Sequence, residues 1–238
     1  LCDRRQRQMC IRDRSSTNIG LAMVTVISAY DMGFENIYDS VKLLQNMIDT
    51  VTKLEKWNGH LYNWYDIKTL APLEPRYVST VDSGNFVGYL YVVKQFLTEH
   101  KRLYENVEDY IAIINKLIEQ TDFSLLYDNS SRLFSIGFDI TENKLTDSYY
   151  DLLASEARQA SFIAISKKDV PVKHWSSLNR TLTAMDGYKG LISWSGTAFE
   201  YLMPNINMKR YKGSLLDESS KFAIMNQLES VSYTHLTL

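Results

Sequence analysis

Two glutamates lie within otherwise apolar stretches of the sequence, where a charged side chain is unusual. Glu156 lies in the block 147–158, and on a helical wheel it shares a face with apolar residues such as Leu152 and Ile163. Glu200 lies in the block 193–204, beside Trp194. Two carboxylates that project from neighbouring helices into one cleft are what the cleavage of a glycosidic bond requires. The pattern therefore favours Glu156 for acid/base chemistry and Glu200 for sugar binding or acid/base chemistry.

Each glutamate also has a structural interpretation. A buried carboxylate costs free energy unless it finds a partner or its pKa rises. Glu156 could form a buried ion pair with Arg158 or with Arg180. Glu200 could be a surface residue on a helix whose apolar face is wide. The separation of the two carboxylates does not follow from the sequence, so these alternatives stay open.

A block rich in aromatic side chains, residues 57–66, is the next candidate. Its sequence, WNGHLYNWYD, combines four aromatic rings with a histidine, two amides and a carboxylate. Sugar rings stack on aromatic faces while amides and carboxylates bind sugar hydroxyls, so the block could line a carbohydrate cleft. It could equally pack over the ends of helices. His60 is expected to be structural, because one histidine makes neither a metal site nor a catalytic triad.

The segment 79–85, STVDSGN, directly precedes an apolar helix. We expect Asp82 to cap this helix, with Asn85 at its third position. On the residues alone, capping is the stronger interpretation.

Several classes of function have little support. The sequence has no glycine-rich phosphate loop of the Walker or dinucleotide type and no Ser/His/Asp elbow, which disfavours nucleotide chemistry and acyl transfer. The 26 Lys and Arg residues against 28 Asp and Glu residues give no basic surface for nucleic acid. No apolar run approaches the roughly 20 residues that span a bilayer, so no membrane contact is expected from this segment. Both cysteines lie in the first ten residues, and we expect no metal site and no cofactor.

The elements that position these residues are expected to be helices. The chain has 238 residues, 45% of them hydrophobic, with only 10 Gly and 4 Pro. Apolar spacing and capping residues predict helices over 17–31, 35–57, 81–101, 103–120, 147–166, 196–208 and 215–228. Residues 58–80 form a long irregular connection, and 132–140 a strand or extended arm. Helix hairpins joined by long loops at one end predict an all-α fold, a partial α/α toroid.

Five segments together resemble the glucoamylase-like region of cyclic β-1,2-glucan synthases. They are TNIGL (17–21), YDMGF (30–34), and the longer blocks 60–88, 149–175 and 191–204. The resemblance covers residues 15–230 and is weakest over 103–125. It implies an (α/α)6 toroid that cyclises linear β-1,2-glucan by transglycosylation, within a large membrane protein whose separate glycosyltransferase domain uses UDP-glucose. Related stand-alone proteins hydrolyse the same polymer. The alternatives are therefore a β-1,2-glucanase or a non-catalytic helical module that binds glycan or serves as a scaffold.

The resemblance also implies roles for individual residues. Glu156 becomes the first choice for the catalytic acid/base. The implied sugar contacts are Trp64, Tyr65, Asp66, Asp82, Asn85, Trp194 and Glu200. The family continues into a WGISESAY-like block with another glutamate, which this chain lacks, so we expect an internal fragment that is inactive alone.

The implied partners are β-1,2-glucan and the other domains of the parent synthase, without nucleic acid. The implied location is the cytoplasmic face of the inner membrane, or the periplasm for a stand-alone glucanase. The two ends of the chain, 1–14 and 231–238, differ in character from residues 15–230. The strings MCIRDR and SYTHLTL resemble translated adapter sequences from sequencing reads. We therefore expect both ends to be non-native and residues 15–230 to form one partial domain.

Overall fold

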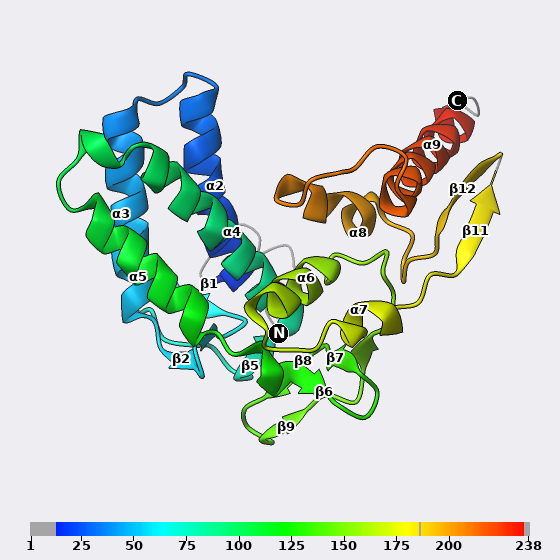
Figure 1. Ribbon diagram of the computed structural model, residues 1–238, viewed down its shortest axis with the longest axis horizontal. Coiled ribbons are helices and arrows are strands. Elements are labelled where there is room, and N and C mark those ends of the chain that lie inside the picture. Colours follow the sequence, from blue (N-terminus) through cyan, green and yellow to red (C-terminus); the bar gives the residue numbers. More distant parts are fainter. Residues whose placement is uncertain (1–12, 186, 236–238) are drawn as a thin grey trace.

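The structure is a computed structural model that describes residues 13–185 and 187–235 (Figure 1). Its helices are α2 (Ser16–Asp31), α3 (Ile37–Lys53), α4 (Thr80–Glu99), α5 (Val107–Gln120), α6 (Arg158–Lys167), α7 (Lys173–Ser177), α8 (Ala198–Leu202) and α9 (Leu215–His235). Short 3-10 helices cover Lys101–Leu103, Phe123–Leu126 and Met203–Ile206. The fold is mostly helical, as predicted.

The central helices form two layers. In the first, α4 lies between α2 and α6, and in the second, α3 packs on α2 while α5 packs on α4 and α3 (Figure 1). Gly84 allows α4 and α6 to approach closely, because a Cβ at this position would lie 2.3 Å from the Cβ of Ala160. Gly20 does the same for α2 and α4, where a Cβ would lie 2.5 Å from Cδ2 of Tyr89. These contacts hold α2, α4 and α6 close together.

Helix α3 illustrates why the apolar spacing predicts helices here. Val41, Leu44, Ile48 and Val51 recur at intervals of three or four residues, and all four are buried. The predicted helix 35–57 is therefore confirmed, with its end at Lys53. The predicted helix 17–31 is confirmed as well, and Ser15 caps it.

Short antiparallel strands correct the all-α prediction. β5 (Tyr77–Ser79), β8 (Gly137–Asp139) and β9 (Lys144–Leu145) form one sheet. β6 (Tyr127–Asp128), β7 (Leu133–Ser135) and β10 (Tyr149–Tyr150) form another. Two-stranded pairs join β1 (Asp13–Arg14) to β4 (Tyr65–Asp66), β2 (Lys56–Trp57) to β3 (His60–Leu61), and β11 (Leu182–Met185) to β12 (Tyr188–Leu191). The strand predicted within 132–140 corresponds to β7 and β8.

The predicted helix 147–166 begins eleven residues later than expected, at Arg158. Tyr149 and Tyr150 form β10, which pairs with Ser135 and Phe134 of β7, so their backbone groups are satisfied by a strand. Glu156 consequently lies in the turn before α6 and not on an apolar helical stripe. The sequence pattern was misleading because local spacing carries no information about pairing with a distant strand.

Two other predicted helices also differ from the structure. The helix expected over 196–208 is divided into α8 and the 3-10 helix Met203–Ile206. The cap of α4 is Ser79, whose Oγ accepts a hydrogen bond of 3.3 Å from the backbone N–H of Asp82. The prediction that Asp82 caps this helix is therefore wrong, and its carboxylate is not used for the cap.

The C-terminal part of the chain has a core of its own. Leu153, Leu178, Leu191, Tyr201 and Ala223 pack together, apart from the main core between the central helices. No helix in the described part of the chain is long and apolar enough to cross a membrane.

The buried guanidinium of Arg158 connects this second core to α6. It donates to the backbone oxygens of Glu200 (3.0 Å), Tyr201 (2.7 Å) and Ser155 (3.1 Å).

The ends predicted to be non-native are only partly described. Residues 1–12, with both cysteines, lie outside the described residues. Asp13 and Arg14 form β1, and α9 continues to His235. The non-native origin of the ends stays a prediction.

Candidate functional site

A cavity of about 800 Å³ lies where the central helices begin. It is formed by the N-terminal part of α2, the first half of α4, the turn before α6, and α8 with the 3-10 helix that follows. Its volume lies within the roughly 300–1,000 Å³ typical of ligand sites. The residues that line it are Ser15, Thr17, Asn18, Leu21, Trp64, Val81, Asp82, Asn85, Tyr89, Glu156, Ala198, Phe199, Leu202, Met203 and Ile206. The cavity thus brings together four of the predicted site residues, namely Trp64, Asp82, Asn85 and Glu156.

Glu156 is half-buried at the edge of this cavity. Burial raises the pKa of its carboxyl group, and the charge of Glu200 acts in the same direction. Ser155 Oγ donates a hydrogen bond of 3.4 Å to Oε2 of Glu156. A carboxyl group with a raised pKa keeps its proton to higher pH, which is what a general acid requires.

The buried ion pair that we considered for Glu156 is not formed. Among the described residues, no Lys, Arg or His lies within ion-pair distance of its carboxylate. The guanidinium of Arg158 is directed to backbone oxygens of α8. Arg180 donates to the backbone oxygens of Leu178 and Trp175. The charge of Arg158 lowers the pKa of Glu156, but burial outweighs it and the pKa stays raised.

Asn63 connects two of the predicted sugar contacts. In the amide orientation that satisfies its neighbours, its nitrogen donates to Asp82 Oδ2 at 3.3 Å and its oxygen accepts from Trp64 Nε1 at 2.9 Å. The backbone N–H of Asn63 donates to the carbonyl of Tyr77 in β5, which fixes the residue in place. The sequence indicated Asn63 only as one of two amides in the aromatic block. Its role between Trp64 and Asp82 was missed.

Asn85 supplies an unpaired acceptor to the cavity. Its side chain is 2% exposed, its Nδ2 donates to Thr17 Oγ1 at 3.2 Å, and its Oδ1 has no partner among the described residues. Tyr89, one helical turn further along α4, has a buried hydroxyl that also lacks a partner there. A buried unpaired polar group costs about 1–3 kcal/mol, which a ligand hydroxyl could recover. Thr17 and Tyr89 were not singled out from the sequence, although the i, i+4 spacing of 85 and 89 would have indicated a shared face.

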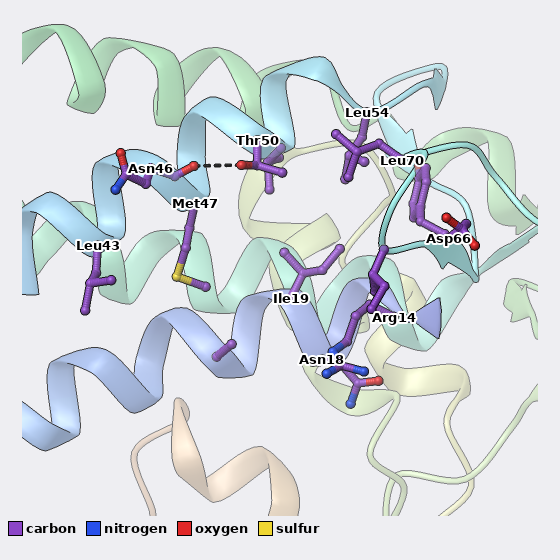
Figure 2. Close-up of a pocket in the computed structure, with 14 residues that line it drawn as sticks. Arg14, Asn18, Ile19, Leu43, Asn46, Met47, Thr50, Leu54, Asp66 and Leu70 are labelled. Atoms are coloured by element: carbon purple, nitrogen blue, oxygen red, sulfur yellow. Dashed lines mark hydrogen bonds between the residues drawn. The ribbon is translucent and has the colours of Figure 1, made fainter. Parts of the chain in front are cut away.

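Tyr65 and Asp66 lie elsewhere, beside a different pocket. Tyr65 is buried, and its hydroxyl donates to the carbonyl of Glu55 at 2.5 Å. Asp66 accepts from the backbone N–H groups of Thr69 and Lys68, which lowers the pKa of its carboxyl group and stabilises a turn. Figure 2 shows Asp66 at this pocket of about 380 Å³, between α2 and α3. Burial thus accounts for Tyr65 and turn hydrogen bonds account for Asp66, while the preceding residue Trp64 lines the cavity.

Trp194 and Glu200 do not line the cavity either. The carboxylate of Glu200 accepts from Ser193 Oγ (2.9 Å), Ser195 N (3.0 Å) and Thr197 N (3.3 Å), and it completes a capping box at the start of α8. Burial alone would raise its pKa, but the bonds from Ser195, Ser193 and Thr197 lower it. Glu200 is only 7% exposed, so it is also not the surface glutamate that we considered.

His60 has two structural partners. One ring nitrogen lies 2.9 Å from Ser83 Oγ and the other 2.9 Å from the carbonyl of Asp122. Burial lowers its pKa to about 4, so it is neutral near pH 7. Across the described ranges, no group of three or more His, Cys, Asp or Glu side chains could hold a metal ion.

Comparison with known proteins identifies relatives in sequence and in fold. No protein-family model matches the chain. The chain is similar to cyclic β-(1,2)-glucan synthase NdvB of Rhizobium meliloti strain 1021, with 26% identity over an alignment of 344 residues. The alignment covers 93% of this chain and 12% of NdvB. The resemblance drawn from the motifs is confirmed. The chain therefore spans only about an eighth of the length of that relative.

Solved structures share the fold at low sequence identity. An endo-β-1,2-glucanase from Chitinophaga pinensis, in complex with sophorotriose and glucose, aligns with a TM-score of 0.75 at 12% identity, over 90% of this chain and 55% of that protein. A glucoamylase-like protein from Bacteroides caccae aligns with a TM-score of 0.78 at 11% identity, over 90% of this chain and 56% of that one. A β-1,2-glucanase from Parabacteroides distasonis has a TM-score of 0.72 at 10% identity, over 89% and 35%. These similarities establish the fold only.

Proposed function

We propose that this chain is part of a carbohydrate-active enzyme whose substrate is β-1,2-glucan, bound in the cavity beside Glu156. The observation that carries the proposal is a desolvated glutamate with no ion-pair partner, in one cavity with an exposed indole, a carboxylate and an unpaired buried amide. The choice of β-1,2-glucan is supported by the similarity to NdvB and by the fold shared with endo-β-1,2-glucanases.

In the proposed reaction, Glu156 is the general acid. It gives its proton to the glycosidic oxygen while a second carboxylate attacks the anomeric carbon from the opposite side. Glu156, now ionised, then takes a proton from the hydroxyl that displaces this carboxylate. When that hydroxyl belongs to the same glucan chain the product is a ring, and when it belongs to water the product is a linear oligosaccharide. Trp64 offers a face for one sugar ring, and Asp82 and Asn85 bind hydroxyls.

The second carboxylate is proposed to lie outside this chain, in the WGISESAY-like block that the family resemblance implies. We propose further that residues 15–230 form part of an (α/α)6 toroid, with α2, α4 and α6 in its inner layer. The share of the solved relatives that the chain covers, 55% and 56%, supports a partial domain. Other domains of the parent synthase are its proposed partners, at the cytoplasmic face of the inner membrane.

The test is Glu156→Gln in a longer version of the protein that contains the following block. Loss of general acid/base catalysis is expected to lower turnover of linear β-1,2-glucan by about 10² to 10⁴. Binding of the glucan should be retained, because the amide keeps the size of the side chain. Glu105→Gln, at an exposed position before α5, is the matched control and should leave turnover unchanged. Unchanged turnover of Glu156→Gln would refute the assignment.

The products separate the proposed transglycosylase from its alternatives. Mass spectrometry distinguishes a ring from the linear chain of the same length, because ring closure removes one water. Rings support cyclisation, linear fragments support a β-1,2-glucanase, and binding without any product supports a non-catalytic module. The present chain alone is expected to be inactive.

A further inference from the structure

A second hollow lies between α4, α6 and residues 207–211. Its volume is about 460 Å³, again within the range of roughly 300–1,000 Å³ for ligand sites. It is lined by Gly88, Tyr91, Gln159, Phe162, Ile163, Ser166, Asn207, Met208, Lys209 and Tyr211. None of these residues lines the cavity beside Glu156 in the described part of the chain. We call this hollow the α4–α6 groove.

Two amide side chains in the groove have unused hydrogen-bonding capacity. Gln159 is 2% exposed, and its Oε1 has no partner among the residues that the structure describes. Both Nδ2 and Oδ1 of Asn207 are buried, and neither has a hydrogen-bond partner among the described residues. Each unpaired buried group costs about 1–3 kcal/mol, so the arrangement is suited to a bound molecule that pairs with both amides.

Gly88 creates the space in which these amides meet. A Cβ at this position would lie 2.3 Å from Gln159 Nε2 and 3.2 Å from Asn207 Nδ2. The two amides therefore converge on the same point of α4, although they are 48 positions apart in the sequence.

The rest of the lining narrows the chemistry of the ligand. Three aromatic rings, Tyr91, Phe162 and Tyr211, are 41%, 52% and 66% exposed. The charged side chain in the described lining is Lys209, whose ammonium lies 5.4 Å from the centre of the Tyr211 ring. A neutral ligand with flat apolar faces and several hydroxyls fits this lining, because each hydroxyl can donate to an amide oxygen and accept from an amide nitrogen. An ordered water could satisfy the amides but would leave the rings uncovered.

We propose that the α4–α6 groove is a second sugar-binding site, which holds a glucose unit of a glucan chain away from Glu156. Gln159 and Asn207 bind its hydroxyls, and Tyr211 and Phe162 cover its faces. The site rests on the residues of the groove, and only the choice of a β-1,2-linked probe rests on the proposed function.

The test is hydroxyl-radical footprinting of the full chain with and without a linear β-1,2-gluco-oligosaccharide. Phe162, Met208 and Tyr211 report on the groove, while Trp64 and Phe199 report on the cavity beside Glu156. Trp194 is exposed and lines neither, so it corrects for radicals consumed by the sugar. Oxidation of the groove reporters is expected to fall by about twofold or more, because a ligand in a pocket buries most of its surface against the lining side chains and shields them from radicals.

Two variants examine the groove residues. Gln159→Met removes the unpaired amide at similar size and should weaken protection of the groove by about tenfold in affinity, or 1.4 kcal/mol. Tyr211→Ala changes an exposed residue and keeps the test valid if Gln159→Met does not fold. Asn85→Leu is the matched control in the other cavity and should leave protection of the groove unchanged.

The outcomes separate this inference from the proposed function. Protection of Trp64 and Phe199 without protection of the groove would overturn the second site and leave the proposed function standing. Protection of the groove alone would support the second site and refute the proposal that the cavity beside Glu156 binds the glucan. Protection of neither would overturn both. Groove protection that is unchanged in Gln159→Met and Tyr211→Ala would overturn the assignment of these residues.

Discussion

Glu156 and Glu200 are expected to affect stability in opposite ways when each is changed to glutamine. Burial raises the pKa of Glu156 more than the charge of Arg158 lowers it, so ionisation of this group opposes folding. Glu200 has a lowered pKa because its carboxylate accepts several hydrogen bonds within its own loop, so its ionisation favours folding. Glu156→Gln should therefore keep or raise the melting temperature at pH 7, and Glu200→Gln should lower it.

The magnitudes follow from the contacts. A hydrogen bond to a charged group contributes about 1.5–3 kcal/mol, and an amide at position 200 would turn its NH2 towards donors such as Ser195 N. Loss of one such bond, about 2 kcal/mol, lowers the melting temperature of a chain of this size by about 4–8 °C. If Glu156 were in a buried ion pair, its change to Gln would instead cost about 3–5 kcal/mol, or about 6–20 °C.

The pH dependence gives a second, independent readout. At pH values below the ordinary pKa of glutamate, near 4.5, Glu156 is protonated in both states and Glu156→Gln should match the parent. Its relative stability should grow as pH rises through the raised pKa of the folded state. The deficit of Glu200→Gln should be complete above the ordinary pKa and should shrink as pH falls through the lowered pKa of the folded state.

The assay is thermal unfolding followed by circular dichroism, between pH 3 and pH 7. Glu105→Gln serves as the exposed control, for which little change is expected at any pH. A fall of about 6–20 °C in the melting temperature of Glu156→Gln at pH 7, as expected for a buried ion pair, would refute the reasoning. An unchanged melting temperature for Glu200→Gln would refute it as well.

Three further changes follow from the packing and from the cavity. Arg158→Met should destabilise the chain by about 1–3 kcal/mol for each backbone oxygen of Glu200 and Tyr201 that it leaves unpaired. Limited proteolysis should then cut first near α8, and an intact α8 would contradict this prediction. Gly84→Ala should cost about 1–3 kcal/mol in chemical denaturation, because its new Cβ would overlap Ala160; a cost below about 0.5 kcal/mol would show that α4 and α6 are less tightly packed. Asn85→Leu should weaken binding of β-1,2-gluco-oligosaccharides by about tenfold in calorimetry while the chain stays folded, and unchanged affinity would exclude Asn85 as a contact.

Local patterns predicted most of the helices because their apolar residues recur at the period of the helix. The stripe in α3 is an example, since Val41, Leu44, Ile48 and Val51 face the core in the structure as the spacing predicts. The motifs also predicted the relative, because the blocks that carry the resemblance extend over most of the chain, and NdvB matches 93% of it.

The same local patterns could not predict which candidates share a cavity. Trp64 and Tyr65 are neighbours in the sequence, yet the first lines the cavity beside Glu156 and the second is buried beside another pocket. Successive side chains of an extended segment point to opposite sides, so an aromatic block that appears uniform in the sequence is divided between two surroundings.

The sequence by itself determined the helical content, the apolar stripes, the family resemblance and the choice of Glu156, since each depends on residue types and on spacing within one segment. Only the tertiary structure decided that Glu156 lies in a turn and forms no ion pair with Arg158, because β10 pairs with β7 and the guanidinium of Arg158 is directed to α8. It also decided that Glu200 binds its own loop and that Gln159 and Asn207 meet at Gly88. Such contacts join segments far apart in the chain or depend on the direction of one side chain, and neither leaves a periodic signal in the sequence.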